Sequence, residues 1–324
     1  MTYQVVVSDV HMIRPEAIRD HLGDAAEATF AELGSVEALV AECEAVDADA
    51  AITDVATPVP AAVFETLDLS VVARAAVGFD NIDVSAAADA GVTVTHVPGY
   101  CTDEVATQAL ALLLACVRAV REYDESVRRG EWAAFPSRNL HRLRGRTLGF
   151  VSFGAIGRRL AELTSGFGVD AVAYDPYLDE SETEDVGVDV ELVGFEELLE
   201  RSDYVSVNAP ATPETRGMFD ADAFSRMRAE SILVNTGRGA VVDEDALVSA
   251  LDAGEIGAAG LDVFESEPLS PESPLTDRED VVLSPHAGWY SEESIEELNR
   301  RVASDVRRVL RGETPESPVD PEWA

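Results

Sequence analysis

Two segments near the C-terminal end of the chain hold side chains that could move a proton. His286 follows the apolar segment Val281 to Leu283, and the segment Leu261 to Pro268 contains both Glu265 and Glu267. A histidine beside a carboxylate has a raised pKa and can act as an acid or a base near neutral pH. A lone His or Glu is more often structural, so these residues need support from other motifs before chemistry is assigned to them.

An arginine in a similar position could bind an anion. Arg238 belongs to the run Asn235 to Asp243, which follows the apolar segment Ser231 to Asn235. An Arg at the carboxyl end of a parallel strand faces the crevice in which ligands bind. Its planar guanidinium suits a carboxylate, because the two groups form paired hydrogen bonds. The alternative for any single Arg is a surface residue in a turn.

The glycine-containing run Ser152 to Gly157 is typical of a dinucleotide-binding turn. It follows the apolar segment Thr147 to Val151 and opens a helix that we predict over Arg158 to Leu163. Gly154 would let the backbone approach a pyrophosphate, and Gly157 would let the helix and the strand pack closely. The N-terminus of the helix would then hold the anion.

An aspartate supports the same interpretation. Asp175 ends the apolar segment Ala171 to Tyr174, and a carboxylate there accepts hydrogen bonds from the adenosine ribose and repels a 2′-phosphate. No basic residue lies in Pro176 to Leu178, so NAD is favoured over NADP. The alternative is a loop aspartate before proline, a common turn pair. The residues that we assign to the cofactor are Ser152, Gly154, Ala155, Ile156, Gly157, Asp175, Ala209, Thr236, Gly237 and Asp262, and we assign no metal site.

These residues need a scaffold of alternating strands and helices. A helix predicted from Thr102 carries an apolar stripe from Val105 to Val120, a polar loop is predicted over Arg128 to Arg146, and an amphipathic helix over Ser291 to Leu310. Strand–helix alternation on both sides of the first helix predicts parallel sheets of the α/β class. The predicted strands are Tyr3–Ser8, Asp49–Thr53, Val71–Ala75, Val92–Val97, Thr147–Ser152, Ala171–Tyr174, Tyr204–Asn208, Ser231–Asn235, Gly257–Leu261 and Val281–Leu283. Those after Arg146 fit a doubly wound dinucleotide-binding sheet.

The composition excludes several classes of partner. The chain has 324 residues, 62 of them acidic and 24 basic, for a net charge of −38, and 46% are apolar. This length suits two domains with real cores, and the negative charge argues against nucleic acid and anionic membranes as partners.

The basic residues are all Arg and the acid is spread along the chain, which indicates a protein kept soluble in high salt. The alternative is a protein that binds cations or basic partners. Three cysteines form no CxxC pair, and the N-terminus lacks the basic region of a signal peptide. We therefore predict a reduced, cytoplasmic location.

In order and spacing, the motifs from Arg74 to Trp289 resemble those of the D-isomer-specific 2-hydroxyacid dehydrogenases. The resemblance implies that Arg238 binds and polarises a 2-oxo acid, that His286 exchanges the proton, and that Glu267 orients His286. Glu267 matches the family position and Glu265 does not. The implied activity is hydride transfer between NAD(H) and a small 2-oxo acid or D-2-hydroxy acid.

The segment Arg74 to Asp83 resembles the substrate-carboxylate loop of the family, in which backbone amides near Val77 and Gly78 meet the acid group. The most similar branch is the C-terminal-binding proteins, which Glu265–Pro268 and His286–Glu292 also resemble. In that branch, Arg74 and Trp289 would line the substrate pocket. Core packing is the alternative for Trp289.

The resemblance also implies an organisation into two Rossmann-like domains, one of them flavodoxin-like. We place the NAD-binding domain at 100–289 and a discontinuous substrate-binding domain at 1–99 with 290–324. We expect the helix from Thr102 to support a homodimer. Two departures stand out, because Ser152 replaces the first glycine of the turn and Gly237 stands where Ala is usual. The alternative function is an NAD(H)-sensing regulatory protein with little turnover, like the animal C-terminal-binding proteins.

Overall fold

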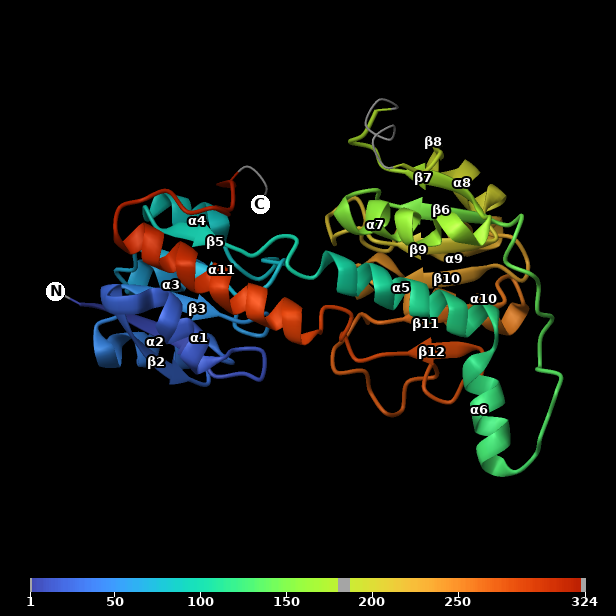
Figure 1. The fold of residues 1–324 in the computed structure, drawn as a ribbon, viewed down its shortest axis with the longest axis horizontal. Helices are drawn as coiled ribbons and strands as arrows, with labels where there is room; N and C mark the ends of the chain where they lie inside the picture. Colours follow the sequence, from blue (N-terminus) through green and yellow to red (C-terminus); the bar gives the residue numbers. More distant parts are fainter. Residues whose placement is uncertain (1, 180–186, 322–324) are drawn as a thin grey trace. The chain divides into compact units, whose positions relative to one another are not determined.

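The computed structural model describes residues 2–179 and 187–321 of the chain (Figure 1). The chain divides into two compact units, of which unit 1 is Met1–Cys101 with Tyr290–Ala324 and unit 2 is Thr102–Trp289. Residue 1 and residues 322–324 of the predicted substrate-binding domain, and residues 180–186 of the predicted NAD-binding domain, lie outside the described residues. Within the described residues, no helix combines the length and the apolar character needed to cross a membrane.

Unit 1 is a parallel sheet of five strands in the order β2-β1-β3-β4-β5. The strands are β1 (Tyr3–Ser8), β2 (Ala26–Ala31), β3 (Ala50–Thr53), β4 (Val71–Arg74) and β5 (Thr93–Thr95). The helices are α1 (Pro15–Leu22), α2 (Val36–Val46), α3 (Ala61–Thr66), α4 (Val84–Asp89) and α11 (Glu292–Leu310), which returns from the C-terminal segment to pack beside α1 and along β3 and β4 (Figure 1). Ser291 begins α11 with a capping box, since its hydroxyl accepts from the Ser294 N–H and the Ser294 hydroxyl accepts from the Ser291 N–H.

Unit 2 is a parallel sheet of seven strands in the order β12-β11-β10-β9-β6-β7-β8. The strands are β6 (Thr147–Val151), β7 (Asp170–Tyr174), β8 (Val190–Leu192), β9 (Tyr204–Val207), β10 (Ile232–Asn235), β11 (Ala258–Leu261) and β12 (Val281–Leu283). The helices are α5 (Thr102–Val117), α6 (Val120–Arg129), α7 (Ala155–Thr164), α8 (Phe195–Arg201), α9 (Ala221–Arg226) and α10 (Glu244–Ala253). Helices α5 and α7 pack on each other, and α9 packs with α8 and α10 (Figure 1).

The predicted fold class, two doubly wound parallel sheets, is confirmed. The strands β9, β10 and β11 are buried along their whole length, which is why they read as continuous apolar runs in the sequence. The sequence analysis missed β2 and β8, which lie at sheet edges. Both contain a glutamate and bury only their first residue, so they lack the continuous apolar run that the edge strand β12 still has.

The segment after Thr102 differs from the prediction. Helix α5 ends at Val117, and Ala119 takes a positive φ of 49°, so the stripe does not extend to Val120. Val120 instead begins α6 and is 53% exposed. Helix α6 ends only at Arg129, inside the predicted loop, because Gly130 stops it in the left-handed conformation.

Candidate active site

The candidate residues of unit 2 follow the carboxyl ends of strands in its sheet, including the edge strand β12. Backbone hydrogen bonds continue past the strands, from Asn208 N–H to Val151 O at 2.9 Å, from Asp262 N–H to Asn235 O at 3.0 Å, and from Ser284 N–H to Leu261 O at 2.9 Å. The segments that leave β9, β11 and β12 are therefore held beside one another at one edge of the sheet. Ligands bind at this edge in doubly wound folds.

His286 and Glu267 make the central contact at this edge. Nδ1 of His286 lies 2.7 Å from Oε2 of Glu267, whose Oε1 accepts the Phe264 N–H at 3.0 Å. Burial alone raises the pKa of Glu267. The hydrogen bonds from His286 and Phe264 and the charges of His286 and Arg238 outweigh burial, and hold that pKa below its usual value. The carboxylate is therefore ionised near neutral pH and fixes the imidazole through Nδ1.

Arg238 is brought beside this pair by a glycine. It precedes the 3₁₀ turn η5 (Gly239–Val241) and its Nη1 donates to Gly237 O at 2.9 Å. A Cβ at Gly239 would lie only 1.9 Å from the carbonyl carbon of Phe264. Only a residue without a side chain lets the Arg238 segment pack against the segment that carries Glu267.

The two glutamates of the segment 261–268 have separate partners. Glu265 accepts the Glu244 N–H at 3.0 Å, and Glu244 accepts the Glu265 N–H at 2.7 Å. Glu244 is the first residue of α10, so Glu265 binds the positive N-terminus of a helix. Of the two glutamates, Glu267 is therefore the one hydrogen-bonded to His286.

Asp262 holds the loop that carries His286. Its Oδ1 accepts the Ser284 hydroxyl at 2.6 Å and the Ala287 N–H at 3.0 Å, and its Oδ2 accepts the Gly288 N–H at 2.8 Å. The side chain of Gln108 in α5 donates to the Ser284 hydroxyl at 2.9 Å. Asp262 is among the residues predicted to bind the cofactor, whereas Ser284 and Gln108 are not among the predicted site residues. A polar residue in an otherwise apolar helix stripe was the available signal for Gln108.

The glycine turn has an unusual first residue. Ser152 takes a φ of 68°, a left-handed conformation that glycine adopts without strain. Its hydroxyl donates to Asp175 Oδ2 at 3.3 Å, and the Phe153 N–H donates to the same oxygen at 3.0 Å. Asp175 thus compensates the strain of Ser152 and ties the end of β7 to the turn before α7.

Close packing brings the predicted cofactor residues together. A Cβ at Gly157 would lie 2.8 Å from Ser152 O, and one at Gly237 would lie 2.6 Å from Ala209 O. Ala is usual at position 237 in the family, but a Cβ there would overlap the backbone of Ala209 in this chain. Beside it, the hydroxyl Oγ1 of Thr236 is buried and has no hydrogen-bond partner among the residues that the structure describes.

A pocket of about 560 Å³ opens beside the His286–Glu267 pair. It is lined by Phe264, Glu267, Pro268, Leu269, Leu283, Ser284, Pro285 and His286. The walls are mostly apolar, and their polar side chains are those of Glu267, His286 and Ser284. Trp289 is not among the lining residues and instead donates its indole N–H to His286 O at 2.8 Å.

The predicted substrate residues of unit 1 follow the strand β4. Arg74 ends β4 and is fully buried, and its Nη2 donates to Thr57 O at 3.1 Å and to Asn81 Oδ1 at 2.6 Å. Its Nε and Nη1 have no partner among the described residues. Burial lowers the pKa of Arg74 to about 10 against the charges of Asp54 and Asp80. It remains a cation at neutral pH.

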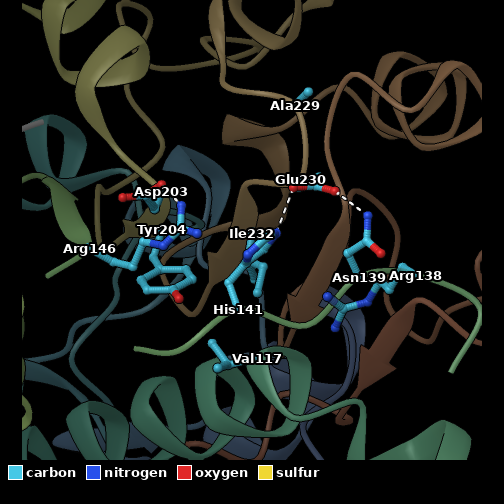
Figure 2. A pocket seen from close by; sticks show the side chains of 10 residues that line it. All are labelled: Val117, Arg138, Asn139, His141, Arg146, Asp203, Tyr204, Ala229, Glu230 and Ile232. Atoms are coloured by element: carbon cyan, nitrogen blue, oxygen red, sulfur yellow. Dashed lines mark hydrogen bonds and ion pairs between the residues drawn. The ribbon is translucent and has the colours of Figure 1, made fainter. Parts of the chain in front are cut away.

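The opposite edge of the unit 2 sheet has a second, much smaller pocket (Figure 2). Its volume is about 20 Å³, and Glu230 accepts hydrogen bonds there from His141 at 2.7 Å and from Asn139 at 2.9 Å. Arg146 pairs with Asp203 at 2.6 Å. The sequence analysis assigned no role to these residues.

Comparison with known proteins decides the family. The model of the "D-isomer specific 2-hydroxyacid dehydrogenase, NAD binding domain" matches residues 110–288. A glyoxylate reductase of Korarchaeum cryptofilum is 44% identical over 85% of this chain and 84% of its own length. The chain belongs to the D-isomer specific 2-hydroxyacid dehydrogenase family.

Two other proteins are similar to this dehydrogenase over most of its length. A D-3-phosphoglycerate dehydrogenase of Mycobacterium leprae is 41% identical over 82% of this chain, which spans only 50% of that relative's length. The crystal structure of a glyoxylate reductase from Paecilomyes thermophila has a TM-score of 0.88 and 28% identity, and covers 100% of both chains. As a member of the family, the dehydrogenase is an NAD(P)-dependent oxidoreductase that transfers hydride between the cofactor and a 2-oxo or 2-hydroxy acid.

The residues of the dehydrogenase fit a dinucleotide. A Cβ at Gly154 would meet nothing within 4 Å, so the first turn of α7 is open for a pyrophosphate. The buried and unpartnered Thr236 hydroxyl offers a polar group to a ligand at the same edge. No group of three or more His, Cys, Asp and Glu side chains in the described ranges is arranged to hold a metal ion.

Proposed function

We propose that the dehydrogenase reduces a small 2-oxo acid with NADH, with Arg238, Glu267 and His286 as its catalytic residues. The observation that carries this proposal is the 2.7 Å contact between His286 and Glu267 beside the pocket of unit 2. The cofactor, when bound, supplies the hydride for the keto carbon. Nε2 of His286 gives its proton to the carbonyl oxygen, which becomes the hydroxyl of the D-2-hydroxy acid.

The other two residues hold the reactants and the proton donor. Glu267 accepts from Nδ1 of His286, keeps the ring oriented and stabilises its protonated form. Arg238 binds the substrate carboxylate and polarises the carbonyl through its planar guanidinium. The motif resemblance also assigns Arg74, Val77, Gly78 and Trp289 to binding of the substrate, and we propose unit 1 as the substrate-binding domain.

We propose glyoxylate as the first substrate to test, because the relative from Korarchaeum cryptofilum is named a glyoxylate reductase. The direct experiment measures NADH oxidation with a panel of 2-oxo acids in high salt, including glyoxylate, hydroxypyruvate and longer aliphatic acids. Turnover with at least one of them is expected. NADH binding without turnover on any of them would reject the proposal.

We propose that NAD is preferred over NADP and that the cofactor occupies the edge formed by Ser152–Gly157, Asp175, Ala209, Thr236 and Gly237. Asp175 supports this preference, because a carboxylate at the end of β7 repels a 2′-phosphate. Its Oδ1 also accepts the Tyr177 N–H at 3.0 Å, so the carboxylate is held in place. Asp262 contributes by holding the loop 284–288 beside the cofactor.

The motif resemblance supports a place near the C-terminal-binding-protein branch within the family. The regulatory alternative associated with that branch is not favoured, because the similar relatives carry the names of reductases and dehydrogenases. We therefore propose that this chain acts as an enzyme that reduces a 2-oxo acid.

We propose a homodimer formed through unit 2, around α5 and the segment that follows it. Exposed apolar side chains on α6 and the segment after it support this proposal, with Val120 53%, Val127 55%, Trp132 82% and Phe135 90% exposed. Single exposed apolar residues are ordinary, but such a series indicates an interaction surface. A monomer at micromolar concentration by light scattering would contradict it.

We propose that the protein is adapted to high salt and acts in the cytoplasm. The net charge of −38 and the absence of Lys support the adaptation to salt. The three free cysteines support the cytoplasm, where disulfides are rare. Repulsion between the carboxylates is screened over about 3 Å at molar salt, and dilution removes that screening. A melting temperature that stays the same from molar to millimolar salt would contradict the adaptation.

A further inference from the structure

One histidine outside the catalytic set lies against the loop of unit 1 that we propose binds the substrate carboxylate. Nδ1 of His96 is 2.8 Å from Val77 O, and its ring meets the ring of Phe79 edge-on, with centroids 5.2 Å apart and planes at 90°. Since a carbonyl oxygen only accepts, the proton must be on Nδ1. His96 therefore donates a hydrogen bond to the backbone of the loop.

The carbonyl group of Val77 belongs to the same peptide unit as the Gly78 N–H, which we propose donates to the substrate. Val77 C=O and Gly78 N–H belong to the same planar trans peptide unit, so they point in opposite directions. A donor that fixes the carbonyl on one side consequently aims the Gly78 N–H to the other side. The same bond polarises the peptide and makes its N–H a stronger donor to an anion.

The rest of the local structure fixes the histidine itself. The Val97 N–H donates to Ala76 O at 2.9 Å and the His96 N–H donates to Ser317 O at 3.2 Å, so the backbone on both sides of the contact is held. Asp305 of α11 accepts the Ser317 N–H at 3.1 Å. The ring thus reaches Val77 from a supported strand end, while Val77 itself is 38% exposed.

The ring is kept uncharged by its surroundings. Burial lowers the pKa of His96, the hydrogen bond to Val77 raises it, and from α11 the charge of Arg301 lowers it while that of Asp305 raises it. The net pKa is below the ordinary value, so His96 is neutral near pH 7. A neutral ring donates to the carbonyl without adding a charge to the loop.

We propose that His96 is a positioning residue for the substrate: through Val77 it orients the Gly78 N–H toward the carboxylate of the 2-oxo acid. This inference rests on the proposed function, which gives the Val77–Gly78 amides the carboxylate. His96 acts on binding of the acid and takes no part in proton transfer or in binding of the cofactor.

The test compares three variants with the native protein in high salt. His96→Phe keeps an aromatic ring against Phe79 but has no donor, and His96→Asn places an amide N–H close to the position of Nδ1. We expect His96→Phe to raise KM for the 2-oxo acid about tenfold, with kcat and NADH affinity within twofold, and His96→Asn to restore most of the loss. His141→Phe, which removes a histidine donor at the far edge of unit 2, is the matched control and should leave KM unchanged.

A second readout does not depend on turnover. Oxamate, an unreactive analogue of a 2-oxo acid, is titrated into the complex with NADH while the cofactor fluorescence is followed, and its affinity should fall in His96→Phe and return in His96→Asn. An unchanged KM and an unchanged oxamate affinity in His96→Phe at unchanged melting temperature would overturn the proposal. A native protein that binds oxamate but reduces no acid would instead reject the proposed function and leave the His96 comparison readable.

Discussion

The two edges of the unit 2 sheet are built on the same strands but leave very different amounts of space for a ligand. At the amino edge, Glu230, Asp203 and Arg146 pair with other protein groups, and the remaining hollow is about 20 Å³ (Figure 2). At the carboxyl edge, the pocket is about 560 Å³ and the Thr236 hydroxyl is buried without a partner among the described residues. Unpaired hydroxyls do not by themselves distinguish the edges, because Ser202 and Ser231 at the amino edge are also buried without a partner among the described residues. The edges differ in the size of their hollows and in the contact between His286 and Glu267.

Positive backbone φ angles do not separate the edges either. Ser152 and His286 have φ values of 68° and 51° at the carboxyl edge, but Glu230 at the amino edge has a φ of 70°. Positive φ is therefore not by itself a mark of function here. The stronger marks are Gly237 and Gly239, where a Cβ would lie 2.6 Å and 1.9 Å from the backbone of another segment.

The close backbone contacts of the glycines at the carboxyl edge should be required for the stability of unit 2. Gly239→Ala should have the largest effect and destabilise unit 2 by more than about 3 kcal/mol, because the new Cβ overlaps the Phe264 backbone. Urea unfolding in high salt measures this loss. Gly154→Ala is the control, since its Cβ would meet nothing within 4 Å and the melting temperature should hold. Equal stability of the two variants would contradict the packing argument.

Asp175→Ala tests the predicted contact between the carboxyl edge and the cofactor. This change removes the acceptor of the Phe153 and Tyr177 N–H groups and the repulsion of a 2′-phosphate. NADH affinity should fall about tenfold, which corresponds to about 1.4 kcal/mol, and NADPH affinity should fall less. Fluorescence titration with both cofactors gives the ratio, and an unchanged ratio would count against the ribose contact.

Glu267, which contacts His286 at the carboxyl edge, should make the stability of the protein depend on pH. The pKa of Glu267 is lowered in the folded protein from an ordinary 4.5, so its ionised form stabilises the fold above that pH, and this stabilisation is lost as the pH falls below it. Glu267→Gln cannot ionise and should lack that part of the acid dependence. The difference in free energy of unfolding between the native protein and Glu267→Gln should shrink as the pH is lowered from about 6 to about 3. Parallel curves for the two proteins would show that the lowered pKa is absent.

The smallest effect is expected at the amino edge. Glu230→Gln keeps a hydrogen-bond acceptor for Asn139 and His141 but removes the charge of an exposed ion pair. Such pairs contribute about 0–1 kcal/mol, so stability should change little, and kcat should not change. A large loss of turnover in this variant would show that the two edges are coupled.

Much of the sheet, and the position of the candidate residues after its strands, could be predicted because both follow local patterns. Buried strands such as β10 appear as continuous apolar runs, and Arg238 follows β10 closely. His286 follows β12, a short edge strand whose three residues are all apolar. The edge strands β2 and β8 and the helix α6 lack that pattern, so they were missed. Edge position and solvent exposure weaken the apolar periodicity on which such predictions depend.

Contacts between distant segments could not be predicted in the same way. Nothing local in the sequence brings Gln108 to Ser284 or His96 to Val77, because each pair meets only after the strands are ordered in the sheet. The choice between Glu265 and Glu267 came from resemblance, and the structure adds the physical reason. Glu265 is occupied at the N-terminus of α10, which leaves Glu267 for His286.

The central claim is that the carboxyl edge of unit 2 carries out the proton transfer through His286. The most direct measurement is the turnover of His286→Ala with NADH and the best 2-oxo acid in high salt, beside His141→Ala from the amino edge. The account predicts a loss of kcat of about 10²–10⁴ in the first variant, with NADH affinity retained, and native turnover in the second. Comparable turnover in His286→Ala and the native protein would contradict the account.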